Sequence, residues 1–267
     1  MTKSDIIRQL KQMNAPQGKP VIVHTSLRAV GEIDGGGQTL LDALIEYFTF
    51  KGGILIIPAH TWVNFYELKK EPSLDFCDNK TCVGALCDIA LADGRGKRTF
   101  NPTHSLTIFG EENIVKEFLQ SEEKVNTPTS PLGAYGKIYD KGGYVLLIGV
   151  GQEKNTFIHC VEEMLCVPNR LSNDCAKMSI KLKDGSMVSG NYRYMQSSIE
   201  DVSVFFPKYE PAFREHGTIV DGFIGKAKTQ LCLAVKIKEV VQRVRENSGG
   251  IELLADDKPL KKEWYVE

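Results

Sequence analysis

A hydroxyl, an imidazole and a carboxylate recur at intervals of three residues in one stretch of the chain. Thr156, His159 and Glu162 are spaced so that, on a helix, their side chains project from neighbouring positions on one face. Histidine changes its protonation near neutral pH and often accepts protons in enzymes. The spacing therefore places a titratable base beside a hydroxyl and a carboxylate.

The position of this stretch favours a functional interpretation. Residues 144–150 form an unbroken apolar run typical of a buried parallel strand, and glycines at 149 and 151 permit a sharp turn after it. Asn155 is a preferred N-cap residue, which predicts a helix over 156–165. An isolated helix histidine is ordinarily structural. Here, strand, turn and helix start together place it at the carboxyl edge of a parallel sheet, where open α/β folds bind ligands.

Three further histidines follow the same pattern. His24, His60 and His104 each lie at or near the end of an apolar run and close to a hydroxyl residue, as His159 does. If these runs are parallel neighbours in a sheet, their carboxyl ends converge on one crevice. The sequence thus predicts a histidine-lined site at one edge of the sheet.

Three kinds of chemistry fit such a site. Imidazoles bind zinc, but the chain has neither HExxH nor the carboxylate–histidine spacing of a known metal site, so we expect no metal. A hydrolase could pair His159 with Ser26, Ser105 or Cys160 as the nucleophile, although the chain has no GxSxG turn. A transferase would need one general base and a site for a phosphate-bearing cofactor.

Residues 25–37 contain features of an anion site. The backbone of residues 25–27 and the glycines at 35–37, which precede a helix at Thr39, could hold a phosphate, because glycine permits close approach and helix N-termini favour anions. The glycines match neither a Walker loop nor the dinucleotide fingerprint, so alone they also fit a flexible turn. Arg28 is either a phosphate clamp or a solvated side chain.

The elements that must position these residues are predicted to alternate. Strand, helix and strand over residues 21–57 predict a βαβ unit, and the alternation on both sides of residues 183–186 predicts a hairpin. Residues 64–81 are polar and predicted to form a surface excursion. The other periodic segments predict helices at about 4–14, 39–48, 83–93, 111–123 and 227–247, strands at 54–57 and 106–109, and a loop with a short helix over 128–141.

Together these elements predict a mixed α/β fold. We expect a largely parallel sheet flanked by helices, with an antiparallel β extension in the C-terminal third. Residues 1–267 contain no repeat or clear linker, so we expect one domain, elaborated at about residues 169–224.

Composition narrows the class of partner. A net charge of −1 at pH 7 argues against binding to nucleic acid, and seven cysteines without a CxxC pair indicate reduced thiols. We find neither a signal-peptide pattern nor an apolar stretch long enough to cross a bilayer. We therefore expect a soluble, cytoplasmic protein that acts on a small molecule, and the sequence leaves its oligomeric state open.

As a set, the motifs resemble the antibiotic N-acetyltransferase family, whose best-known members are aminoglycoside 3-N-acetyltransferases. The resemblance covers about residues 20–165, with a weaker echo at 217–227, and its specificity lies in the set and its order. The matching pieces are His24-Thr25-Ser26-Leu27-Arg28 with Gly31, residues 52–61, Asn101-Pro102-Thr103-His104-Ser105, Ser130-Pro131-Leu132 and residues 146–162.

The resemblance implies acetyl transfer from acetyl-coenzyme A (acetyl-CoA) to an amine of an aminoglycoside-like antibiotic. By position, His159 matches the family's general base, Glu162 the carboxylate that orients it, and Thr156 a hydroxyl that stabilises the oxyanion. The residues that match the coenzyme A site are His24, Thr25, Ser26, Leu27, Arg28, Gly31, Thr103, His104 and Ser105. The alternatives are a metal- or Ser/His-dependent hydrolase using the same crevice and a module that binds coenzyme A or antibiotic without turnover.

The chain departs from the family pattern in two places. Thr25-Ser26 replace the family's usual pair of serines, and a hydroxyl is kept at both positions. Residues 62–83 lack the family's aromatic and proline pattern, which leaves the acceptor least constrained. Because aminoglycosides are polycations, their site should be acidic; the candidate side chains are Glu67, Asp75, Glu162, Glu163 and Glu200.

Overall fold

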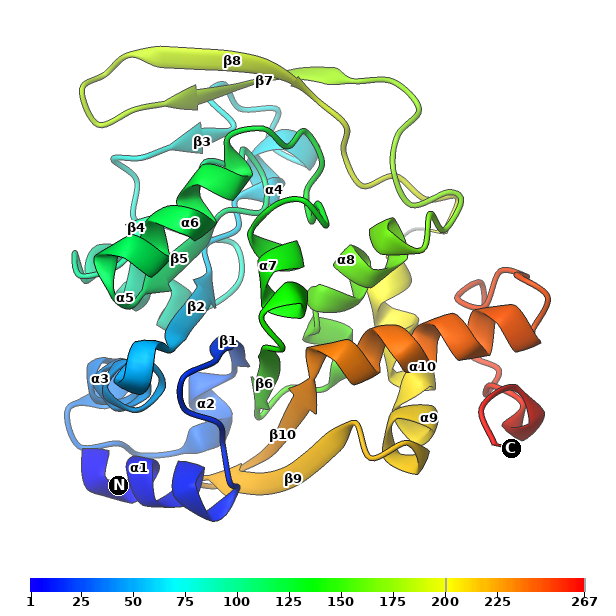
Figure 1. The fold of residues 1–267 in the computed structure, drawn as a ribbon. Helices are drawn as coiled ribbons and strands as arrows, with labels where there is room; N and C mark the ends of the chain where they lie inside the picture. Colours follow the sequence, from blue (N-terminus) through cyan, green and yellow to red (C-terminus); the bar gives the residue numbers. More distant parts are fainter. Residues whose placement is uncertain (200, 267) are drawn as a thin grey trace.

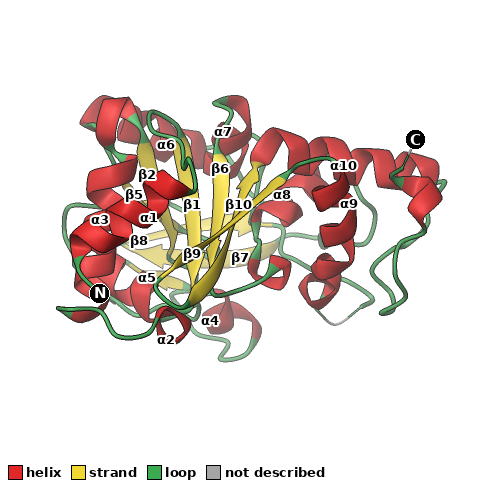
Figure 2. Ribbon diagram, turned by 90° about the horizontal axis from the view of Figure 1, so that it is seen from below, coloured by secondary structure: helices red, strands yellow, loops and turns green. Residues whose placement is uncertain are grey.

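A mixed seven-stranded sheet lies between two layers of helices in the computed structural model, which describes residues 1–199 and 201–266 (Figures 1 and 2). The strand order is β4-β5-β2-β1-β6-β10-β9. Among these strands, β1 pairs in parallel with β2 and β6, while β5 and β10 run antiparallel to their neighbours. The strands are β1 (Pro20–Thr25), β2 (Ile54–Pro58), β4 (Lys97–Arg98), β5 (Leu106–Phe109), β6 (Tyr144–Ile148), β9 (Ile219–Ile224) and β10 (Ala227–Leu233). The predicted mixed α/β fold is confirmed, with its parallel pairing at the centre.

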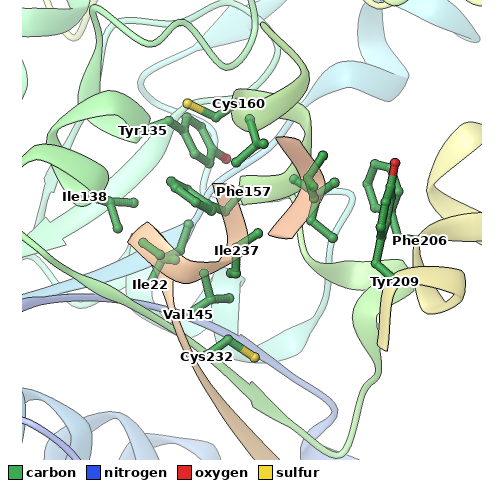
Figure 3. Close-up of a cluster of buried hydrophobic side chains, with 14 of the residues drawn as sticks. Ile22, Tyr135, Ile138, Val145, Phe157, Cys160, Phe206, Tyr209, Cys232 and Ile237 are labelled. Atoms are coloured by element: carbon green, nitrogen blue, oxygen red, sulfur yellow. The ribbon is translucent and has the colours of Figure 1, made fainter. Parts of the chain in front are cut away.

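Both faces of the central strands are buried, which explains their continuous apolar runs. In β1, Val21 and Val23 face one hydrophobic cluster and Ile22 faces the other, as the two-residue period of a strand requires. Helices α1 (Lys3–Gln12), α3 (Gly36–Phe48) and α5 (Ala85–Ala92) cover the first face. The second face is covered by the 3-10 helix η3 (Val202–Tyr209) and by helices α6 (Glu112–Glu122), α7 (Ala134–Asp140), α8 (Phe157–Met164), α9 (Glu210–Glu215) and α10 (Ala234–Asn247). Figure 3 shows part of the hydrophobic cluster on this side.

The start of the last long helix differs from its prediction. Residues 227–233, predicted as helix, form β10, and α10 begins at Ala234. Burial in this segment alternates from Ala227 (buried) to Lys228 (exposed) to Thr229 (buried), which is a strand period. Because β10 pairs with both β6 and β9, it extends the main sheet rather than the helical layer.

The predicted β hairpin is present but belongs to a second sheet. Strands β7 (Ala176–Lys181) and β8 (Met187–Tyr192) pair antiparallel, and β3 (Leu74–Asp75) pairs in parallel with β7. The segment predicted as a polar surface excursion therefore contributes a strand to this sheet. The short helix α4 (Trp62–Tyr66) overlaps the start of this segment, and Leu74 within it is fully buried.

Two further sequence predictions concern the chain as a whole. No helix within the described residues is long and apolar enough to span a membrane. The organisation of residues 1–267 as one domain stays a prediction, consistent with two helical layers that share one sheet.

Candidate active site

The four histidines of the sequence pattern lie at or beside one edge of the main sheet. His24 is the penultimate residue of β1, and His60 lies two residues beyond the end of β2. His104 precedes β5, which is antiparallel to β2, so the start of β5 lies beside the end of β2 with Leu106 opposite Pro58. The assumption that all the runs are parallel is wrong for β5. Its reversed direction nevertheless brings His104 to the predicted edge.

Three of these imidazoles are buried and uncharged. His60 Nε2 is 2.9 Å from the Tyr135 hydroxyl, and the His60 and His104 ring centroids are 4.7 Å apart. Burial lowers the pKa of His24 and of His104 to about 3. The pKa of His60 is also well below its ordinary value, through burial first and then through repulsion from His104, His24 and His159. His60 therefore lies within electrostatic range of the other three rings.

Helix α8 supplies the fourth imidazole, and its N-cap lies one residue later than predicted. Thr156, rather than Asn155, occupies the N-cap position, and its carbonyl accepts from the His159 backbone N–H at 3.1 Å. The Asn155 amide donates to the Gln152 side-chain oxygen at 2.8 Å, so it stabilises the preceding turn. Thr156 and His159 remain one turn apart, as predicted.

His159 has the carboxylate partner that the spacing predicted. Its Nδ1 lies 3.2 Å from Glu162 Oε2, and its ring packs edge-on against Phe206 with centroids 4.8 Å apart. An ionised carboxylate only accepts hydrogen bonds, so the proton belongs on Nδ1 and Nε2 keeps its lone pair. The His159 side chain is 15% exposed and that of Glu162 is 3% exposed. The pair therefore presents a proton-accepting nitrogen on a partly accessible ring, held by a buried carboxylate.

The predicted coenzyme A residues of the first strand divide into two groups. His24 Nε2 and Thr25 Oγ1 are buried and have no hydrogen-bond partner within the described chain, which is uncommon for buried polar atoms. Ser26 Oγ accepts from the Ala29 N–H at 3.3 Å and caps the four-residue helix α2 (Leu27–Val30). These two atoms thus have unmet hydrogen-bonding capacity, whereas the Ser26 hydroxyl has a structural partner.

The remaining predicted coenzyme A residues also differ in their surroundings. Arg28 is exposed, and Gly31 ends α2 with φ +87°, a conformation that favours glycine. Leu27 packs with the hydrophobic cluster beneath α1 and α3, so its side chain has a place in the core. The structure therefore does not bring all of these side chains together.

Residues 103–105 form a buried loop before β5. The Asn101 side-chain oxygen accepts from the N–H groups of Thr103, at 3.2 Å, and His104, at 2.9 Å. Thr103 Oγ1 lies 2.9 Å from His104 Nδ1, while Ser105 Oγ donates to the Ala59 carbonyl at 2.7 Å. These contacts fix the loop.

Two candidate nucleophiles of a hydrolase are buried or bonded to the backbone. Cys160 is fully buried, and burial raises the pKa of its thiol well above its ordinary value. The Ser105 hydroxyl is directed at Ala59. Within residues 1–199 and 201–266, no three His, Cys, Asp or Glu side chains are grouped so as to hold a metal ion. The structure therefore offers no support for the hydrolase alternative.

Most of the acidic side chains considered for the acceptor already bind groups of the protein. Asp75 pairs with Lys181 at 3.1 Å, and Glu163 accepts from the side chains of Thr127 and Thr129 at 2.6 and 2.7 Å. Glu67 is exposed at the end of α4. Glu200 lies outside the described residues.

The site contains residues that the sequence did not single out. Arg170 Nε donates to Glu162 Oε1 at 2.6 Å, Tyr135 bonds His60, and Phe206 packs on the His159 ring. Asn101 belonged to a recognised motif and Phe206 to an aromatic-rich segment, so each carried a weak signal. Arg170 and Tyr135 carried no such signal, because only tertiary packing brings them to Glu162 and His60.

Comparison with known proteins identifies the family. The sequence model of the aminoglycoside 3-N-acetyltransferase family matches residues 22–246. The chain belongs to this family. Its members include the aminoglycoside N(3)-acetyltransferase IV of Salmonella sp., which is 27% identical over 190 residues, covering 71% of this chain and 68% of the relative.

Two further relatives extend the similarity. The SPbeta prophage-derived aminoglycoside N(3')-acetyltransferase-like protein YokD of Bacillus subtilis (strain 168) is 22% identical over 247 residues, covering 86% of this chain and 87% of the relative. The structure of AAC-IIIb in a binary complex with CoASH matches with a TM-score of 0.78 and 18% identity, covering 92% of this chain and 97% of that one. The latter similarity places this member of the aminoglycoside 3-N-acetyltransferase family in the same fold.

Proposed function

We propose that the protein transfers the acetyl group of acetyl-CoA to an amine of an aminoglycoside-like antibiotic. The observation that carries the proposal is the His159–Glu162 pair, 3.2 Å apart at the histidine-lined edge of the sheet, in a chain of the aminoglycoside 3-N-acetyltransferase family. Acetyl-CoA is the expected co-substrate, and the chemistry requires no metal.

The reaction needs one base and one oxyanion donor. A protonated amine cannot attack, so the acceptor reacts as the neutral amine, after one proton has left to solvent. As the amine nitrogen bonds to the thioester carbonyl carbon, His159 Nε2 takes a second proton from that nitrogen. The Thr156 hydroxyl donates to the oxyanion of the tetrahedral intermediate. When the intermediate collapses, the carbon–sulfur bond breaks and His159 returns its proton to the departing thiolate, giving CoASH and the N-acetylated product. Glu162 holds the His159 proton on Nδ1 throughout.

The coenzyme A site is assigned to the end of β1 and the loop before β5. The unpaired His24 Nε2 and Thr25 Oγ1 support this assignment, because a bound ligand would supply the partners that the protein does not. The positive charge of the exposed Arg28 suits a phosphate group. The relative AAC-IIIb has been observed with CoASH, which supports the choice of co-substrate.

The acceptor class rests on the family and on the named activity of the Salmonella relative. Its site would lie beside His159, whose Nε2 takes the proton of the acceptor amine. A cytoplasmic location, where acetyl-CoA is available, completes the proposal.

Product analysis of the purified protein tests the proposal directly. The protein is incubated with acetyl-CoA and a panel of aminoglycosides and simple amines, and acetylated acceptor and CoASH are quantified by mass spectrometry, since the exposed Cys77, Cys166 and Cys175 would react with thiol reagents. We expect equal amounts of both products, formed only with an acceptor. Hydrolysis of acetyl-CoA without acetylated acceptor, or calorimetric binding of CoASH without turnover on any amine, would contradict the proposal and favour a hydrolase or a binding module.

A further inference from the structure

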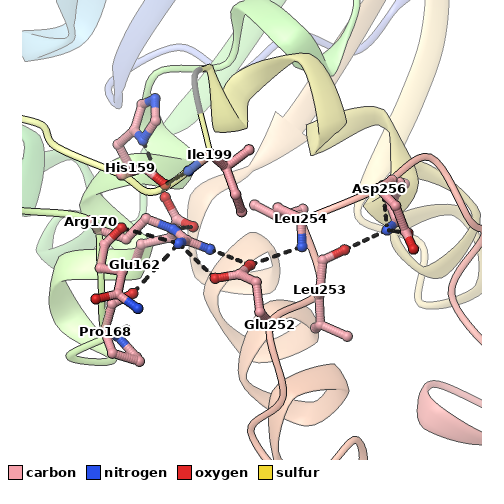
Figure 4. Close-up of polar contacts among 12 residues, drawn as sticks. His159, Glu162, Pro168, Arg170, Ile199, Glu252, Leu253, Leu254 and Asp256 are labelled. Atoms are coloured by element: carbon pink, nitrogen blue, oxygen red, sulfur yellow. Dashed lines mark hydrogen bonds and ion pairs between the residues drawn. The ribbon is translucent and has the colours of Figure 1, made fainter.

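The His159 ring is held on two sides, and both supports lead to one segment near the C-terminus. Glu162 contacts Nδ1 on one side, and Phe206 of η3 packs against the ring on the other. Glu162 is linked to residues 252–256 through Arg170, and η3 is bonded to the same segment through Lys208. Figure 4 shows the polar part of this arrangement.

The carboxylate side continues through a buried arginine. Arg170 Nε donates to Glu162 Oε1 at 2.6 Å, while its two terminal nitrogens donate to the Glu252 carboxylate at 2.9 and 2.8 Å (Figure 4). The Arg170 side chain is 6% exposed. Burial alone would lower the pKa of Arg170, but the Glu252 hydrogen bonds and the Glu162 charge outweigh it and raise that pKa. The guanidinium is therefore a permanent charge shared between two carboxylates.

The aromatic side is bonded to the same segment. Lys208, two residues after Phe206 in η3, donates to the carbonyls of Leu253 and Asp256 and lies 3.3 Å from Asp256 Oδ1. Residues 252–256 thus bond both the arginine behind Glu162 and the helix that carries Phe206.

This segment is anchored rather than loosely attached. Gly249 and Gly250, each with φ +73°, turn the chain at the end of α10. Leu253 and Leu254 are buried in the hydrophobic cluster of that face, and the Leu254 N–H donates to the Glu252 carboxylate at 2.9 Å. The buried leucines and this hydrogen bond therefore hold Glu252 in position beside Arg170.

We propose that Glu252 and Arg170 are positioning residues of the acetyl-transfer site, and that together they set the charge that Glu162 presents to His159. The inference rests on the proposed function and adds a part of the site that lies outside the recognised motifs. Arg170 partly neutralises the negative charge of Glu162, and Glu252 partly neutralises the positive charge of Arg170. Removing the charge of Arg170 and removing the charge of Glu252 should therefore change the proton affinity of His159 in opposite directions.

Other charged and titratable groups surround this network and stay constant in the test. Glu163 of α8 also interacts with His159, but Thr127 and Thr129 hold its carboxylate. Among the described residues, the other groups that interact with this network include His60 and His104 at the sheet edge, Tyr209 of η3 and Arg245 of α10.

The pH dependence of kcat/KM in two charge-removing variants tests the inference. In Glu252→Gln, the Arg170 charge is less compensated, so a proton on His159 is less favourable and the acidic limb should move to lower pH by about half a unit. In Arg170→Gln, the Glu162 charge is uncompensated, and the limb should move to higher pH by a similar amount. Arg170→Lys should return it toward the native position, because it restores the charge. A merely structural role would lower the rate without shifts of opposite sign.

A control and a second readout keep the test decisive. Asp42 of α3, on the other face of the sheet, forms an ion pair with Arg95. Asp42→Asn breaks this pair and should leave the acidic limb of kcat/KM in place. NMR titration of the His159 imidazole, assigned with His159→Gln, should show the same opposite shifts without any acceptor. If turnover is absent and the NMR shifts are present, the proposed function fails, while the electrostatic coupling of Arg170 and Glu252 to His159 stands.

The inference is overturned if the NMR midpoint and the acidic limb stay at the native position in Glu252→Gln, or if both charge variants move in the same direction. Should Arg170→Gln fail to fold, the Glu252→Gln shift measured against Asp42→Asn decides the matter.

Discussion

His159 and the group formed by His24, His60 and His104 are the same residue type in one region of the molecule, yet their environments differ. The three members of the group are buried, and their pKa values lie far below the ordinary range. His159 has a buried carboxylate at Nδ1 and a partly accessible ring. The comparison teaches that clustering alone does not identify a base, because the partner of each ring decides which one can gain and lose a proton during reaction.

Substitution of each kind of histidine gives the largest expected difference. His159→Asn should lower kcat roughly 10²–10⁴-fold, since it removes the general base. His60→Asn should change kcat less than about 10-fold, because His60 bonds Tyr135 and has no role in proton transfer in our proposal. Steady-state kinetics of both variants, with thermal unfolding to verify folding, measures the difference. Equal losses of kcat would remove the distinction between the two kinds of histidine.

The hydroxyl one turn before His159 should have the next largest effect. Thr156→Val removes the proposed oxyanion donor while keeping the shape of the side chain, and should lower kcat roughly 10²–10³-fold. Thr156→Ser keeps the hydroxyl and should retain most of the native kcat. If valine and serine give the same rate, Thr156 stabilises no charge in the transition state.

The buried histidines should respond mainly through stability. Tyr135→Phe leaves the buried His60 Nε2 without its 2.9 Å partner, which should lower the free energy of unfolding by about 1–3 kcal/mol. Denaturant unfolding measures this change, and kcat of the folded variant should remain near that of the native protein. A large loss of kcat with unchanged stability would instead make the Tyr135–His60 pair part of the chemistry.

The last expected effect is on the pH dependence of stability. The pKa of His24 is about 3 in the folded protein and its ordinary value is 6.5, so its contribution to stability is complete above about pH 6.5 and is lost as pH falls toward 3. Each such histidine adds about 1.4 kcal/mol per pH unit to the slope in that range. His24→Gln should reduce the slope of the unfolding free energy between about pH 4 and 6 by that amount.

Two residues calibrate that measurement. Thr25→Val alters a neighbouring buried polar group that does not titrate in this range, and should change stability without changing the slope. Glu122, whose pKa burial raises to about 7, contributes a slope of the opposite sign between its ordinary pKa and about pH 7 in all variants. An unchanged slope in His24→Gln would show that His24 is not held neutral by burial.

Local sequence signals predicted much of the fold. The central strands β1, β2 and β6 are apolar runs because both of their faces are covered, and the hairpin of β7 and β8 follows from alternation around a turn. The apolar residues of 227–233 fitted a helix as well as a strand, so β10 was missed. Its state is decided by hydrogen bonds to β6 and β9, which lie elsewhere in the sequence.

The sequence by itself determined which residues of the candidate site share one helix face. The spacing of Thr156, His159 and Glu162 follows from the period of a helix, and the contact of His159 with Glu162 at 3.2 Å agrees with it. Tertiary structure alone decided that β5 would bring His104 to the same edge by running antiparallel. It also decided that Arg170 would meet Glu252, 82 residues further along the chain. The physical reason is that helical spacing is fixed by local backbone geometry, whereas strand direction and buried ion pairs depend on how distant elements pack.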